Sequence, residues 1–205
     1  ELADAVELIT KSETVLQVFL QAPNIKWFRR NISTARAVFI APQILRGEFL
    51  IGDSGGSGVL LARDPATGKW SYPGFYAINS VSMGLQIGAD ASEIILLVMT
   101  EQGMQAMLTP DIRMGAKIVA AAGPVGKGTA PYRADIIAYA RSMMGIISGI
   151  SLTGSVISPR NALNNAYYGR TVSLQDILLR RTVKNYQAES LRGRLRTAGT
   201  SSNGN

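Results

Sequence analysis

Cysteine and histidine are both missing from this chain of 205 residues. Without cysteine there are no thiol nucleophiles, no disulfides and no thiolate metal sites. Without histidine the chain lacks imidazole metal ligands and the commonest general base near neutral pH. We therefore expect no metal site and no other cofactor.

Charged residues are also few, at 17% of the chain, and acids are the scarcer sign, so the formal net charge is +7. A hydrophobic content of 46% is enough for one substantial core and excludes wholesale disorder. The positive excess favours an anionic partner: nucleic acid, an acidic membrane or an acidic protein. No segment reaches about 18 consecutive apolar residues, so we predict no transmembrane helix.

Short apolar runs separated by Gly-rich or Asp-Pro turns fill the segment 47–99. Their links are too short for helical crossovers, so they predict successive antiparallel strands at 48–51, 59–62, 70–78, 81–87 and 94–99. Further strands are predicted at 37–41, 116–122, 135–140 and 145–157.

Helical periodicity is strongest near the two ends of the chain. It predicts helices over 2–21 and 25–35, then 101–108, 160–168, a helix after Ser173, and 188–196. Ser158 and Pro159 have N-cap and first-turn chemistry for the helix that Gly169 closes.

These elements predict one α+β domain over 1–198. Helices of 1–36 and 158–198 pack on a strand-rich core, 37–157, whose sheet is antiparallel and strongly curved or barrel-like. The Gly-, Ser- and Asn-containing tail, 199–205, is expected to be disordered.

Two motifs suggest chemistry that the rest of the chain does not support. Gly52-Asp53-Ser54-Gly55-Gly56 matches a serine-hydrolase signature, but no imidazole is present to accept the hydroxyl proton, so we interpret it as a Gly-rich hairpin turn. The segment 123–128 lacks the spacing of a nucleotide-binding phosphate loop. A turn that offers backbone N–H groups to an anion stays open there.

Basic and aromatic side chains alternate in 26–30. Lys26, Arg29 and Arg30 flank Trp27, a combination that suits a membrane interface, where indole lies at headgroup depth and cations meet lipid phosphates. The alternative is that Trp27 and Phe28 pack into the core while the cations are simply solvated.

A second basic segment lies at 160–196, which holds eight cations and two acids. Arg180, Arg181 and Lys184 form a second candidate lipid-binding patch, although a solvated helix surface carries such runs equally well. We expect no nucleic-acid partner, because the basic segments lack an RNP aromatic signature and a helix-turn-helix.

Many short motifs in a fixed order resemble the SYLF domain family, over residues 12–185. They include WF at 27–28, GEF at 47–49, GGSGVLL at 55–61, PGFY at 73–76, GLQIG at 84–88, AAGPVG at 121–126 and AYYG at 166–169. The resemblance implies binding of phosphoinositides and other acidic lipids, and, in eukaryotic members fused to a Src-homology module, of actin.

The chain looks like the stand-alone bacterial members of that family, which implies the cell envelope. We accordingly expect a periplasmic or membrane-associated protein, exported by an upstream signal or lipoprotein segment that is not in this chain. Eukaryotic members contact membranes through a basic N-terminus, but residues 1–23 here are acidic, so we move that hypothesis to 26–30 on physical grounds.

Three functions follow, in this order of preference. The first is non-enzymatic, peripheral, salt-sensitive binding of acidic lipid or phosphoinositide membranes. The second is an envelope protein-binding or assembly module without direct lipid contact, with a protein partner that the sequence does not identify and an exposed apolar patch. The third is an enzyme, which needs a deep pocket with convergent carboxylates and lysine.

Overall fold

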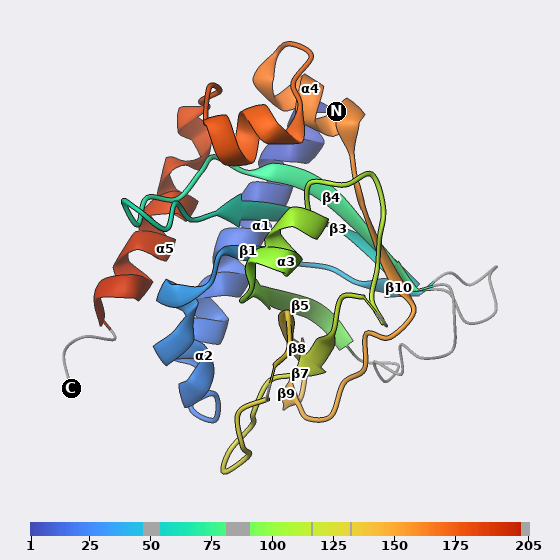
Figure 1. The fold of residues 1–205 in the computed structure, drawn as a ribbon, viewed down its shortest axis with the longest axis vertical. Coiled ribbons are helices and arrows are strands. Elements are labelled where there is room, and N and C mark those ends of the chain that lie inside the picture. Colours follow the sequence, from blue (N-terminus) through green and yellow to red (C-terminus); the bar gives the residue numbers. More distant parts are fainter. Residues whose placement is uncertain (47–53, 81–90, 116, 132, 202–205) are drawn as a thin grey trace.

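A strongly curved sheet lies at the centre of the structure, a computed structural model that describes residues 1–46, 54–80, 91–115, 117–131 and 133–201 (Figure 1). Within these residues the sheet has ten strands, eight of which follow the spatial order β6-β10-β4-β3-β1-β5-β8-β7. The strands are β1 (Ala37–Ala41), β2 (Leu45–Arg46), β3 (Ser54–Ala62), β4 (Gly74–Ser80), β5 (Ala91–Val98), β6 (Ile112–Arg113), β7 (Ala120–Ala122), β8 (Ile136–Ser142), β9 (Gly145–Ile147) and β10 (Ser155–Pro159).

Helices from both ends of the chain pack on this sheet, as predicted (Figure 1). The N-terminal helices are α1 (Leu2–Gln21) and α2 (Lys26–Asn31), and the C-terminal helices are α4 (Asn161–Tyr168) and α5 (Glu189–Ser201). The short helix α3 (Glu101–Ala106) comes from the middle of the chain, and there are 3-10 turns at Ile32–Thr34 and Tyr186–Ala188 and a π-helical turn at Asp176–Arg180. Helix α5 reaches into the segment expected to be disordered, and 202–205 lie outside the described residues.

The central strands are buried on both faces, which explains their continuous apolar runs. In β1, Phe39 joins the cluster around α3, whereas Val38 and Ile40 join the cluster that contacts α1, α2, α4 and α5. Met104 and Met107 are buried in the first cluster. The predicted single α+β domain with a curved sheet is therefore confirmed.

One pair of strands departs from the predicted antiparallel pattern, because β7 runs parallel to β8. The two edge strands, β6 and β7, are also drawn together: Met114 and Ile118 form an isolated bridge just beyond them. Gly115 N–H donates to the Ile118 carbonyl at 2.9 Å. The sheet edges are thus linked by a turn, which gives the barrel-like curvature.

The glycine motif at 52–56 belongs to a strand where the structure describes it. Residues Ser54 to Leu60 pair with β4, so the predicted hairpin turn is wrong for Ser54, Gly55 and Gly56. A Cβ on Gly56 would lie 2.3 Å from the Gln43 carbonyl oxygen, so the neighbouring chain crosses too closely for a side chain. The match to a serine-hydrolase signature is a by-product of this close packing.

The predicted strand at 145–157 is wrong as a single element. It divides into β9, which pairs with β8, and β10, which pairs with β4 and β6. Gly149 and Gly154 between them have φ of +69° and +87°, values that turn the chain out of an extended path.

Other boundaries also differ from the predictions. The helix cap predicted at 158–159 is wrong, because Ser158 and Pro159 end β10 and the Ser158 hydroxyl donates to Asp111 at 2.8 Å. The closing Gly169 is confirmed, with φ of +69°. The strands predicted at 48–51 and 81–87 lie outside the described residues.

Candidate functional site

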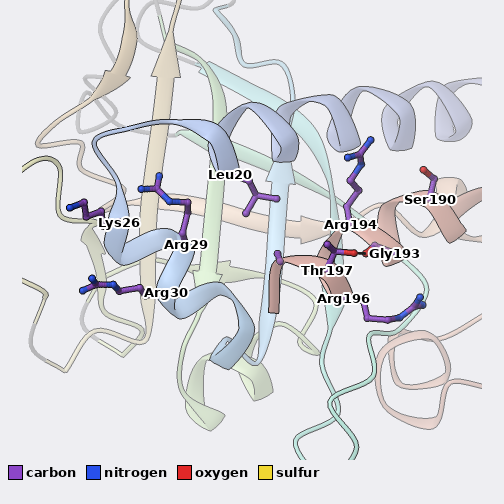
Figure 2. A pocket seen from close by; sticks show the side chains of 10 residues that line it. Leu20, Lys26, Arg29, Arg30, Ser190, Gly193, Arg194, Arg196 and Thr197 are labelled. Carbon is purple, nitrogen blue, oxygen red and sulfur yellow. Dashed lines mark hydrogen bonds between the residues drawn. The ribbon is translucent and has the colours of Figure 1, made fainter. Parts of the chain in front are cut away.

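A groove of about 710 Å³ lies where the end of α1, helix α2 and helix α5 meet. Five cations line it, three from α2 and two from α5: Lys26, Arg29, Arg30, Arg194 and Arg196. Figure 2 shows the α2 side chains extending to one side of Leu20 and the two α5 arginines on the other. Leu20 and Ala198 also line it, so the groove combines apolar side chains with cations.

Burial of one aromatic ring orients α2. Phe28 is fully buried, with its ring centroid 6.0 Å from that of Phe19 and 5.3 Å from that of Tyr139. With Phe28 inside, Lys26 and Arg30 face solvent, one helical turn apart. Like charges at this spacing repel each other, and a bound anion would reduce this repulsion. The surface of α2 therefore has a positive potential that favours an anion.

Arg29 has a structural contact in addition to its place in the groove. Its guanidinium donates to the Ala22 carbonyl, the C-cap of α1. A cation at this position also interacts favourably with the negative end of the 20-residue helix dipole. Arg29 therefore couples the end of α1 to α2 while it contributes charge to the groove.

Helix α5 presents its cations in the same way. Leu191 and Leu195 are fully buried against α1, so Arg194 and Arg196 lie on the exposed side of the helix. Both arginines have carboxylate partners. Arg194 Nε lies 3.2 Å from Glu13 Oε1, and Arg196 Nη2 lies 3.4 Å from Glu189 Oε1.

Glu189 is held by several donors. Tyr72 donates its hydroxyl at 2.9 Å, and Arg192 Nη1 lies 2.7 Å from Glu189 Oε2. Burial would raise the pKa of Glu189, but the bonds from Tyr72 and Arg192 outweigh it and lower this pKa. Arg192 also covers the Tyr72 ring at 4.1 Å, so this network fixes the start of α5.

The α2 cations differ from those of α5 in their ionic partners. Across 1–46, 54–80, 91–115, 117–131 and 133–201, no carboxylate forms an ion pair with Lys26, Arg29 or Arg30. The groove therefore holds five cations against the two carboxylates of Glu13 and Glu189. This excess suits a ligand with more than one negative charge.

Trp27 is half-buried and packs against the core beside α2. Its ring contacts the core, as one interpretation expected, and keeps an exposed portion next to the α2 cations. Contact of that portion with a membrane stays a prediction. The second tryptophan, Trp70, is only 5% exposed. A change in tryptophan environment at the surface would therefore come from Trp27.

The second candidate patch, Arg180, Arg181 and Lys184, is not part of the groove lining. Arg180 pairs with Asp176 at 2.9 Å. The hydrogen bonds from Arg180 and Ser173 lower the pKa of Asp176. Arg181 donates to the carbonyls of Lys69 at 2.8 Å and Ala62 at 3.3 Å, and burial lowers its pKa. Lys184 is exposed.

Sequence reasoning missed Arg194 and Arg196 as partners of the α2 cations. A usable signal was present, because Ala188, Leu191 and Leu195 follow helical spacing and define a buried stripe, with Arg194 beside it. Their convergence with α2, however, depends on the docking of α5 against α1 and the 3-10 turn after α2.

The glycine-rich segment 123–128 is tied to the α1–α2 turn. Gly126 N–H donates to the Asn24 carbonyl at 2.7 Å, and Gly123 N–H to the Ala138 carbonyl at 2.8 Å. Gly128 N–H donates to Val125 at 3.3 Å. These three N–H groups are engaged internally, so the segment does not offer them to an anion.

Two smaller grooves have other linings. One of about 450 Å³ includes Asp4, Glu7, Lys11 and Arg160, with Glu7 and Lys11 paired at 2.9 Å. The other, of about 520 Å³, lies between α3 and 111–118. Where residues are described, no cluster of three or more acidic ligands could hold a metal ion, and no helix is long and apolar enough to span a bilayer.

Comparison with known proteins matches this chain to one family. The family model described as "Ysc84: Las17-binding protein actin regulator" matches residues 79–198, more than half of the chain. "SH3 domain-containing YSC84-like protein 1" is 30% identical in Homo sapiens and 31% in Rattus norvegicus, each over 154 residues and 72% of this chain. "LAS seventeen-binding protein 3" of Saccharomyces cerevisiae is 29% identical over 143 residues, 66% of this chain.

These relatives are longer proteins. The match covers 44% and 45% of the two mammalian chains and 31% of the yeast chain, so it spans less than half of each. The family description names Las17 binding and actin regulation, and the yeast relative is named as a binding protein.

Proposed function

The chain belongs to the Ysc84 (SYLF) family, and we propose that it binds acidic phospholipid membranes, including those with phosphoinositides, peripherally and without enzymatic activity. The observation that carries this proposal is the basic groove between α2 and α5. Its three α2 cations have no carboxylate partner among the described residues, so their charge is available to lipid phosphates.

The expected strength follows from the number of these cations. Each Lys or Arg near an anionic membrane surface contributes about 1 kcal/mol, so the three α2 cations contribute about 3 kcal/mol, on the order of 100-fold in partitioning. Because the Debye length is about 8 Å at physiological salt and 3 Å at 1 M, this contribution weakens as salt is added. The exposed part of Trp27 adds an interfacial aromatic ring beside these charges.

The test is co-sedimentation with vesicles of phosphatidylcholine alone, with phosphatidylserine, and with a phosphoinositide, each at low and high salt. Two variants with equal charge change are compared: Lys26→Gln/Arg30→Gln in the groove and Arg180→Gln/Lys184→Gln in the second patch. Arg29 is kept, because it holds the end of α1. Circular dichroism checks that both variants are folded.

We expect salt-sensitive binding to the acidic vesicles, reduced in the Lys26/Arg30 variant and largely retained in the Arg180/Lys184 variant. The reverse pattern would move the site to the second patch. Absence of binding to every vesicle at low salt would refute the lipid function. Tryptophan fluorescence should shift on binding, and the shift can be assigned to the partly exposed Trp27 because Trp70 is buried. Trp27→Phe should abolish it.

A protein partner is the second candidate function. The yeast relative is named as a binding protein, and this fold exposes two adjacent apolar side chains at the β8–β9 turn: Met143 is 93% exposed and Met144 is 92% exposed. Such an exposed pair suits contact with another protein. A pull-down at high salt should recover a partner that Met143→Ser/Met144→Ser loses, and a pull-down that recovers nothing would argue against this function.

Location in a bacterial cell envelope stays a prediction. Fractionation of cells that express the full-length protein would test it, and recovery in the cytosol alone would contradict it.

A further inference from the structure

Glu13 is the one residue of the acidic N-terminal helix whose carboxylate contacts a cation of the groove, as far as the described residues show. It comes from the middle of α1, whereas its partners Ser190 and Arg194 belong to α5. Ser190 donates its hydroxyl to Glu13 Oε1 at 2.6 Å, and Arg194 Nε lies 3.2 Å from the same oxygen. Both partners also line the groove.

The side chains lie at the margin of the groove rather than in the open solvent. That of Glu13 is 20% exposed and that of Arg194 is 45% exposed. Figure 2 shows Arg194 extending from α5 toward α1, which carries Glu13. The carboxylate therefore lies where it offsets the charge of Arg194 and accepts a hydrogen bond from the Ser190 hydroxyl.

An anionic ligand in the groove meets two opposing effects at this point. Arg194 and Ser190 are donors that a phosphate would use, but Glu13 already occupies one nitrogen of Arg194 and the hydroxyl of Ser190. The Glu13 charge also repels a phosphate that approaches Arg194. The α2 cations have no such competitor among the described residues.

We propose that Glu13 is a built-in counter-anion of the groove, which competes with phosphate groups for Arg194 and Ser190 and sets how much negative charge a ligand needs to bind. This inference rests on the proposed anion-binding function of the groove. A ligand with one charge is held by α2 alone, whereas a ligand with several closely spaced phosphates displaces Glu13 and engages α5 as well.

The test replaces Glu13 by glutamine, which keeps the shape of the side chain and removes its charge. Glu7→Gln is the matched control, because Glu7 lies on the same helix, carries the same charge and pairs with Lys11 instead. Both are measured with phosphatidylcholine/phosphatidylserine vesicles and, separately, by calorimetry with inorganic tripolyphosphate. The soluble anion distinguishes the groove from a membrane.

Exposed ion pairs of this kind are weak, so we expect Glu13→Gln to tighten tripolyphosphate binding about two- to five-fold. Glu7→Gln should leave this affinity nearly unchanged, because it alters the net charge without touching Arg194. In an Arg194→Gln background the gain from Glu13→Gln should shrink, because the competition for that guanidinium is gone and only the competition for Ser190 remains.

Three results would overturn the inference. Equal gains from Glu13→Gln and Glu7→Gln would show a net-charge effect alone. Weaker binding by Glu13→Gln would show that the carboxylate positions Arg194 rather than competing for it. A gain that persists undiminished in the Arg194→Gln background would exclude the contact with Arg194 as its cause.

The two probes separate this inference from the lipid function. If tripolyphosphate binding shows the Glu13-dependent gain and no vesicle is bound, the counter-anion stands and the lipid function fails. If vesicles are bound and tripolyphosphate binding shows no Glu13 effect, the lipid function stands and the counter-anion fails. If neither probe binds, both are refuted.

Discussion

Neutralising a single groove cation should weaken membrane binding more when that cation has no carboxylate partner than when it has one. Lys26 and Arg30 have no carboxylate partner among the described residues, so each contributes its full value of about 1 kcal/mol at an acidic surface. Lys26→Gln or Arg30→Gln should therefore weaken binding to phosphatidylserine vesicles about five-fold, and the double variant about 30-fold.

Arg194 should matter less, because its charge is already offset by Glu13 at 3.2 Å. An exposed pair retains roughly 0.2–1 kcal/mol of coupling, so Arg194→Gln should cost between nothing and about 0.8 kcal/mol, less than four-fold in affinity. The ranking compares residues of one groove, so it does not depend on the absolute strength of binding.

The assay is co-sedimentation at a series of salt concentrations, with Arg170→Gln as a control at an exposed cation outside the groove lining. The slope of binding against salt should fall most for Lys26→Gln and Arg30→Gln. A loss for Arg194→Gln as large as that for Lys26→Gln would refute the reasoning, and a similar loss for Arg170→Gln would show that only net charge matters.

Three further predictions concern stability. Gly123→Ala should lower the free energy of unfolding in a denaturant titration by about 1–3 kcal/mol, because its Cβ would lie 2.1 Å from the buried Tyr139 ring. An unchanged unfolding midpoint would contradict this packing. Arg181→Ala should lower the free energy of unfolding by about 1–3 kcal/mol, because its hydrogen bonds to two carbonyl groups are lost, and it should leave vesicle affinity unchanged. A folded variant with weaker vesicle binding would show that Arg181 belongs to the lipid site. The pKa of Glu189 is lowered from its ordinary 4.5, so its stabilising effect is present above that value and is lost as pH falls through the folded pKa. The melting temperature of Glu189→Gln should therefore fall less on acidification than that of the unmodified protein. An identical fall would count against the contact with Arg192.

Local pattern determined the elements that depend on near neighbours. The apolar stripe of residues 2–21 predicted α1 with its correct bounds, and the run at 37–41 predicted β1, because burial on one stripe or on both faces imposes a period along the chain. The lack of cysteine and histidine excluded whole classes of chemistry from composition alone. The order of short motifs led to the correct family.

The local sequence pattern did not predict contacts between strands that are distant along the chain. The glycines at 55–58 were predicted as a turn, yet they continue β3, because the space beside them is taken by the chain around Gln43 and Ile40. In the same way, 145–157 alternates like one strand, but its halves pair with different neighbours, and two positive-φ glycines separate them.

The groove shows the division most clearly. Its α2 cations were found from the sequence, because a helical turn places Lys26, Arg29 and Arg30 together. Arg194 and Glu13 were not, because 181 positions separate them along the chain and only the packing of α5 on α1 makes them neighbours. Composition and periodicity fix which charges a helix exposes, whereas the partner of each charge is decided by which buried faces meet.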